Sequence, residues 1–203
     1  MIKNLLFDLG GVIMDIRRQN CEDAFRALGM ADIGDFLGDY GQTGPFAALE
    51  EGAIEPPQFR DELRRHIPRP VTDAEIDAAF NRFLIGIPVK RLEMLRQLRR
   101  RYRVYMLSNT NPIMWNSKIA DEFRQEGLTR EDYFDGMVTS FEAKCYKPDP
   151  AIFRYAEKTL DIDPDETLFF DDSRANVNAA IALGFKGAHV PPGTEFYKIP
   201  IID

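Results

Sequence analysis

The apolar residues of this chain follow two different spacings. Short apolar runs bounded by turn-forming residues predict five buried strands, at residues 2–7, 104–108, 136–140, 167–172 and 187–190. Between the later runs, apolar residues recur at helical spacing. Buried strands separated by helices are typical of a parallel sheet. The pattern therefore predicts an α/β fold with a doubly wound, Rossmann-like parallel sheet.

Residues 17–88 show only the helical spacing. Three helical segments occur there, and no convincing strand separates them. A stretch with four glycines, 34–44, interrupts the pattern. We therefore predict a helical cap domain at 17–88, inserted into a catalytic α/β core domain made of 1–16 and 89–203. A helical face packed permanently on the core is an equally open interpretation.

Three sites in the sequence indicate where helices of the core begin: two dipeptides and one serine. Asn111-Pro112 and Asp149-Pro150 each combine an N-cap residue with proline at the first helical position. Ser173 is suited to cap a further helix that ends before Gly184.

Composition and charge exclude several classes of protein. At 203 residues with a net charge of −7, the chain suits one domain with an insertion and does not resemble a general nucleic-acid binder. Two cysteines are too few for a disulfide framework or a thiolate zinc site, which favours a reducing compartment. No segment approaches the ~20 apolar residues of a membrane span. We expect a cytoplasmic monomer or homodimer without nucleic-acid or membrane partners.

Polar residues gather where ligands bind in open α/β sheets, at the carboxyl ends of the strands. Three of the predicted strands end in such residues and a loop adds a lysine: Asp8, Ser108, Asn109, Asp171, Asp172 and Lys147. Neighbouring carboxylates require a compensating cation, and oxygen ligands suit Mg²⁺. A metal and a lysine beside a nucleophilic carboxylate form a site for a phosphate monoester. Each residue alone is more often a turn or cap residue, so the hypothesis depends on their convergence.

Four motifs, in this order, resemble those of the haloacid dehalogenase-like hydrolase superfamily, in its branch with a helical cap. They are FDLGGV at 7–12, LSNT at 107–110, KPDP at 147–150 and FFDDS at 169–173. The resemblance implies that Asp8 is the nucleophile and that Lys147 is catalytic and also binds phosphate. It further implies that Ser108 binds the phosphoryl group, with Asn109 beside it.

The same resemblance implies a Mg²⁺ site. Its ligands would be Asp8, the backbone carbonyl of Gly10 and Asp172, with Asp171 close to the metal or its waters. Most phosphatases of the family carry a second aspartate, the general acid and base, where this chain has Gly10. Loss of that group removes about 10²–10⁴-fold of catalysis unless a cap residue, water or the substrate supplies the proton. Some sugar-phosphate phosphatases of the family resemble this chain at Gly10, whereas phosphomutase chemistry is disfavoured.

The favoured function is a Mg²⁺-dependent hydrolase of a small phosphorylated metabolite, with sugar phosphates among the candidates, acting through an aspartyl-phosphate on Asp8. One alternative is a 2-haloacid dehalogenase, although that branch usually has an aromatic residue at the position of Gly10 and lacks the Asp171-Asp172 pair. Another is a non-catalytic phosphometabolite-binding protein on the same fold. Candidate cap residues facing substrate, or else ordinary cap residues, are Tyr40, Gln42, Thr43, Phe46 and Glu50.

Overall fold

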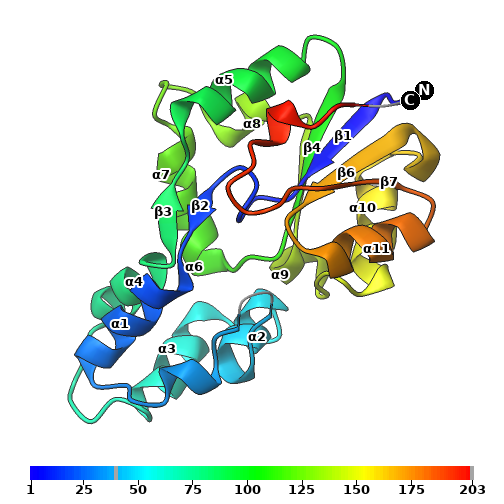
Figure 1. Cartoon of the computed structure of the whole chain (residues 1–203). Coiled ribbons are helices and arrows are strands. Elements are labelled where there is room, and N and C mark those ends of the chain that lie inside the picture. Colours follow the sequence, from blue (N-terminus) through cyan, green and yellow to red (C-terminus); the bar gives the residue numbers. More distant parts are fainter. Residues whose placement is uncertain (39–40, 202–203) are drawn as a thin grey trace.

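A five-stranded parallel sheet forms the centre of the computed structural model, which describes residues 1–38 and 41–201 (Figure 1). The strands are β1 (Asn4–Phe7), β4 (Arg103–Ser108), β5 (Gly136–Thr139), β6 (Thr167–Asp171) and β7 (Lys186–His189). Their order is β5-β4-β1-β6-β7, so β1 is central. The five predicted strands and the doubly wound α/β class are confirmed.

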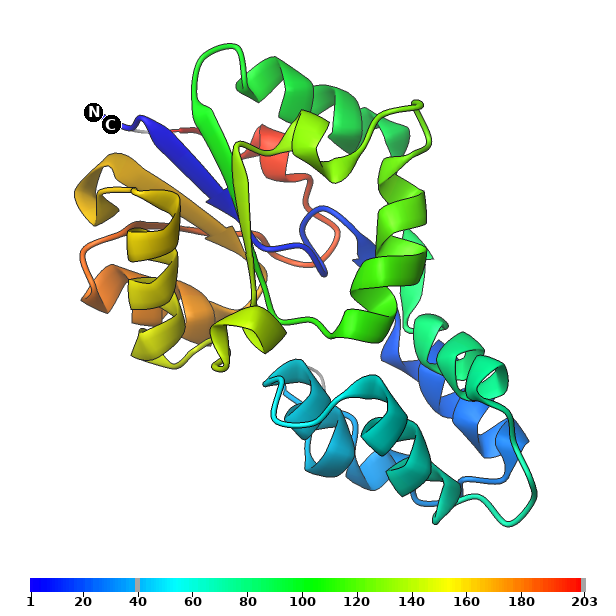
Figure 2. The ribbon, with the colours of Figure 1, turned by 180° about the vertical axis from the view of Figure 1, so that it is seen from behind.

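Helices cover both faces of this sheet (Figures 1 and 2). Alternate residues of β1 point to opposite faces: Leu6 packs in the cluster that includes α10 (Pro150–Leu160) and α11 (Arg174–Ala182), whereas Leu5 and Phe7 pack in the cluster that includes α5 (Val89–Leu98). Shorter helices complete the core: α6 (Pro112–Met114), a π-helical turn (Trp115–Ile119), α7 (Ala120–Phe123), α8 (Arg130–Tyr133) and α9 (Ser140–Ala143). Three 3₁₀ turns lie at Ile33–Asp35, Pro164–Glu166 and Phe196–Lys198. No helix in the described ranges combines the length and apolar content needed to cross a membrane.

The predicted helix starts are confirmed. The Asn111 side chain accepts a hydrogen bond from the backbone N–H of Met114 at 3.0 Å, directly ahead of Pro112 in α6. The side chains of Asp149 and Ser173 cap α10 and α11 in the same way. Each cap thus fixes the point at which a strand-end loop becomes a helix.

Four helices lie together beyond the carboxyl ends of the strands (Figure 1). They are α1 (Arg18–Leu28), α2 (Gly44–Glu50), α3 (Pro56–Arg64) and α4 (Asp73–Asn81). Their interior is aromatic, because the ring of Phe46 packs edge to face on Phe25, Phe59 and Phe80 at 5.7, 5.0 and 5.1 Å between centroids. The segment predicted as the cap is therefore packed around aromatic rings, which belong to the same hydrophobic cluster as Leu5 and Phe7 of β1.

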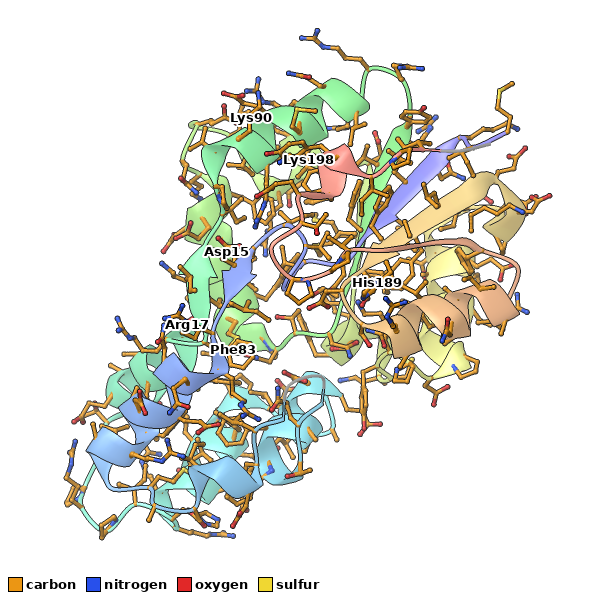
Figure 3. The ribbon with its side chains drawn as sticks, viewed as in Figure 1. Asp15, Arg17, Phe83, Lys90, His189 and Lys198 are labelled. Atoms are coloured by element: carbon orange, nitrogen blue, oxygen red, sulfur yellow. The ribbon has the colours of Figure 1, made fainter. Side chains whose placement is uncertain are left out.

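The connection between the cap helices and the sheet is a short antiparallel ladder of β2 (Asp15–Ile16) and β3 (Leu84–Gly86). The expectation that residues 17–88 contain no strand is wrong at β3. Three residues are too few to show an alternating pattern, so pairing with β2 alone defines this strand. Figure 3 shows Arg17 beside Phe83, where the Arg17 N–H donates to the Phe83 carbonyl at 2.8 Å. Both chain crossings therefore pass through one hydrogen-bonded junction.

Candidate active site

A cavity of about 110 Å³ opens between the carboxyl ends of the strands and the cap helices. The core supplies its polar wall, which includes Asp8, Gly10, Ser108, Asn109, Lys147, Asp172 and Asn176. The cap and its junction supply a mostly apolar wall, which includes Ile16, Gln42, Glu50, Phe80, Phe83 and Leu84. The sequence-predicted residues at the strand ends therefore do converge.

The Lys147 ammonium group holds two carboxylates together. Its Nζ donates hydrogen bonds to Asp8 Oδ1 at 2.7 Å, to Asp171 Oδ2 at 2.8 Å and to the Leu107 carbonyl at 2.9 Å. The Lys147 side chain is almost wholly buried. Burial lowers the pKa of Lys147, but the charges and hydrogen bonds of Asp171 and Asp8 outweigh this effect and raise the pKa overall. Lys147 is therefore a fixed cation at the end of β1.

One lysine does not balance three carboxylates. Burial, opposed by Lys147 and reinforced by Asp171 and Asp172, raises the pKa of Asp8 to about 7. Burial and then Asp171 raise the pKa of Asp172 to about 6. One oxygen each of Asp8, Asp171 and Asp172 lies within 4.8 Å of the others. A hard divalent cation would relieve this crowding, and three carboxylate oxygens are a donor set that fits Mg²⁺.

Asp171 and Asp172 have different surroundings. Asp171 Oδ1 accepts from the Ser173 N–H at 2.8 Å and from Asn176 Nδ2 at 3.0 Å, and its Oδ2 accepts from Lys147. Asp172 instead faces the cavity, and its backbone carbonyl accepts from His189 Nε2 at 2.9 Å. This arrangement fits the expectation that Asp172 binds a metal directly while Asp171 lies beside it. Figure 3 places His189 at the end of β7.

Asn176 is a site residue that sequence reasoning missed. Its Nδ2 bridges both oxygens of Asp171, at 3.0 and 3.1 Å, and the residue also lines the cavity. A usable signal was present, because Asn176 lies three residues after the helix cap Ser173. That spacing places its side chain in the first turn of α11, facing back toward the end of β6.

Asn109 positions the lysine loop. Its Oδ1 accepts from the Lys147 backbone N–H at 2.9 Å, and its Nδ2 donates to the Lys147 carbonyl at 3.0 Å. Both halves of the side-chain amide are thereby engaged with one residue. Ser108 is also buried at the cavity wall, and within the described residues its Oγ makes a single long contact, 3.3 Å, with the Asn109 carbonyl. Ser108 is thus the better placed of the two to bind a ligand through its side chain.

The two glycines after Asp8 tolerate side chains differently. A Cβ atom at Gly10 would lie 3.5 Å from Ile16 Cδ1, an ordinary contact. Gly11 has φ +78°, and a Cβ atom there would lie 2.3 Å from Asp172 Oδ2. Only glycine therefore fits at position 11, whereas space alone does not exclude a side chain at position 10.

We predict that Gly11→Ala weakens Mg²⁺ binding by about 10- to 100-fold, because the new methyl group displaces the Asp172 carboxylate. Calorimetric titration with Mg²⁺ measures the effect. Gly193→Ala is the matched control, since Gly193 has φ +79° and open space around its Cβ position. Equal Mg²⁺ affinity of the two variants would contradict a steric role for Gly11 beside Asp172.

Of the four candidate cap residues that the structure describes, Gln42 and Glu50 line the cavity. Thr43 is exposed and its Oγ1 donates to the Asp35 carbonyl at 2.8 Å. Phe46 belongs to the aromatic interior of the cap helices. Of the two alternatives left open by the sequence, Thr43 and Phe46 are therefore ordinary cap residues, and Tyr40 lies outside the described residues.

Comparison with known proteins gives consistent matches. The sequence model of the haloacid dehalogenase-like hydrolase family matches residues 2–184. A D-ribitol-5-phosphate phosphatase from Bacteroides thetaiotaomicron is 40% identical over 196 residues, which are 97% of this chain and 95% of the relative. The crystal structure of a HAD family enzyme from the same organism, in complex with magnesium and inorganic phosphate, superposes with a TM-score of 0.91 at 40% identity, covering 98% of both chains. An L-2-haloacid dehalogenase from Xanthobacter autotrophicus superposes with a TM-score of 0.62 at 22% identity over 94% of this chain and 78% of that one, a likeness of fold alone.

Proposed function

This chain belongs to the haloacid dehalogenase-like hydrolase family and is a Mg²⁺-dependent phosphatase, and we propose that its substrate is the phosphate monoester of a short sugar alcohol or sugar. The observation that carries the proposal is the pairing of Lys147 with two carboxylates at the floor of a small cavity. A cation and a metal-binding acidic cluster suit a phosphoryl group. The 40% identical relative, named for D-ribitol 5-phosphate, supports a polyol as the leaving group.

In this proposal Asp8 attacks the phosphorus atom and forms an aspartyl-phosphate, which water then hydrolyses. Lys147 orients Asp8 through their 2.7 Å hydrogen bond and offsets negative charge at the reacting group. Ser108 donates a hydrogen bond to a phosphoryl oxygen from the buried cavity wall. Asp8, Asp172 and the Gly10 carbonyl would hold Mg²⁺, with Asp171 beside it, and the bound ion would supply positive charge against the phosphoryl group.

The acidic cluster also weighs against the two alternatives. A dehalogenase displaces a halide without a metal, and nothing in that reaction requires Asp172 to crowd Asp8 and Asp171. A binding protein without catalysis has no need of a buried carboxylate held on Lys147 at 2.7 Å. The geometry therefore favours phosphoryl transfer.

The test is phosphate release from D-ribitol 5-phosphate, other polyol phosphates, anomeric sugar phosphates and acyl phosphates, with Mg²⁺ and with EDTA. We expect release that requires Mg²⁺ and is fastest with a short polyol or sugar phosphate. Halide release from a 2-haloacid in EDTA would support the dehalogenase alternative. Tight binding of these phosphates without turnover would support the binding protein.

A further inference from the structure

Glu50 stands on the cap side of the cavity, at the last residue of α2. The end of α2 is held against the core at α9, which Figure 2 shows directly above it. Lys144 Nζ donates to the Gly52 carbonyl at 2.7 Å, and Gly52 lies so close to the Phe141 carbonyl that a Cβ atom would approach it to 2.2 Å. Because α9 leads into the loop that carries Lys147, this contact ties the helix end that bears Glu50 to that loop, and Glu50 and Lys147 line the same cavity.

The Glu50 carboxyl group has no hydrogen bond or ion pair within residues 1–38 and 41–201, the part of the chain described. Glu50 is half-buried, in a cavity wall that the cap and its junction build mostly from apolar side chains, Phe80 and Phe83 among them. Unpartnered carboxyl groups in apolar surroundings keep their proton. Burial accordingly raises the pKa of Glu50 to about 8.

Few charged groups face Glu50. On the core side of the cavity these are Asp8, Asp172 and Lys147, which belong to the cluster already described. On α9, Lys144 is engaged with the Gly52 carbonyl. On α3, the other helix packed on α2, Arg60 and Arg64 form ion pairs with aspartates of α3 and α4. Glu50 is therefore the only titratable group that the described part of the cap presents to the cavity.

An alkoxide is a poor leaving group, so a phosphatase of alkyl phosphates needs an acid on the side of the departing oxygen. Gly10 has no side chain to provide it. Resting on the function proposed above, we propose that Glu50 is the general acid and base of this enzyme, acting from the cap. The cap then completes the catalytic groups when it covers the substrate.

The two half-reactions balance at Glu50. In the first, the bond from phosphorus to Asp8 forms, the bond to the substrate oxygen breaks, and that oxygen takes the Glu50 proton. In the second, Glu50, now a carboxylate, takes a proton from water as the water oxygen bonds to phosphorus and the bond to Asp8 breaks. Phosphate leaves, and Glu50 is protonated again for the next cycle.

The test compares Glu50→Gln with wild type on D-ribitol 5-phosphate and on 4-nitrophenyl phosphate, whose leaving group needs no proton. With the alkyl phosphate we expect kcat to fall by about 10²–10⁴-fold with little change in KM. With the aryl phosphate we expect a burst of about one nitrophenol per enzyme, then slow turnover, because only hydrolysis of the aspartyl-phosphate still needs the base.

The pH profile is a second test. Wild-type kcat/KM for the alkyl phosphate should fall as pH rises through about 8, where Glu50 loses its proton, and Glu50→Gln should lack this decline.

Glu51→Gln is the matched control, because Glu51 follows on the same helix end but does not line the cavity. We expect it to retain wild-type kcat for both substrates. Equal losses for both substrates without a burst, or an increase in KM alone, would overturn the proposal. If wild type cleaves the aryl phosphate in a Mg²⁺-dependent way but no polyol or sugar phosphate, the proposed substrate class fails, and the burst still tests Glu50.

Discussion

Asp8→Asn is expected to abolish phosphatase activity, lowering kcat by roughly 10⁴–10⁶-fold, because an amide does not attack phosphorus and no aspartyl-phosphate forms. The substitution keeps the shape of the side chain, and Lys147 retains its 2.8 Å hydrogen bond to Asp171. The loss should therefore come from chemistry and not from unfolding.

Thermal stability distinguishes a loss of chemistry from unfolding of the Asp8→Asn variant. Burial raises the pKa of Asp8 to about 7 in the metal-free fold, so the folded state holds a proton that an ordinary aspartate releases near 3.8. Folding stability that depends on this group therefore falls as pH rises from about 4 to 7. In EDTA at pH 8, Asp8→Asn should unfold at a temperature equal to or above that of wild type.

Phosphate release with Mg²⁺, together with thermal unfolding in EDTA, checks this prediction. Asp121→Asn serves as the control for an aspartate change as such, since that side chain is 73% exposed. Activity of Asp8→Asn within tenfold of wild type would rule out Asp8 as the nucleophile.

The strand ends of the active site were predictable because buried parallel strands leave a clear pattern. Residues 5–7 of β1 and 168–170 of β6 are all apolar and lead directly to Asp8 and Asp171. A polar residue that ends such a run must lie at the carboxyl edge of the sheet. The order of residues along the chain was therefore enough to predict that these side chains lie close together. The same reasoning placed Ser108 at the end of β4.

Other features depend on contacts between distant segments, which no local pattern records. Strand β3 exists only through its pairing with β2, some 70 residues earlier in the chain. In the sequence Glu50 is one of two adjacent glutamates, and nothing local distinguishes it from Glu51. Its proximity to the catalytic groups follows from the packing of Gly52 on Phe141, about 90 residues away. Asn109 likewise acts on the Lys147 backbone, which the sequence places 38 residues later.

Lys147→Met should both inactivate and destabilise the protein. Methionine approximates the lysine stem but leaves Asp8 and Asp171 buried without their cation. Breaking a buried ion pair from one side costs about 3–5 kcal/mol, and loss of a charge-stabilising group lowers kcat by about 10²–10³-fold.

The destabilisation should depend on pH and on Mg²⁺. Without Lys147, Asp8 loses the cation that opposes the effect of its burial, so its folded-state pKa rises further above its unfolded one. The fold therefore loses stability as pH rises through that interval. In EDTA the variant should therefore be closer to wild type at pH 5 than at pH 8, as measured by urea unfolding. At pH 8, Mg²⁺ should recover part of the loss, because it supplies positive charge to the same oxygens.

Lys158→Met, at an exposed position on α10, controls for a lysine change as such and should lose little stability. An equal loss of stability at both pH values, unaffected by Mg²⁺, would mean that Lys147 holds the fold by packing and that its charge is not what the acidic cluster requires.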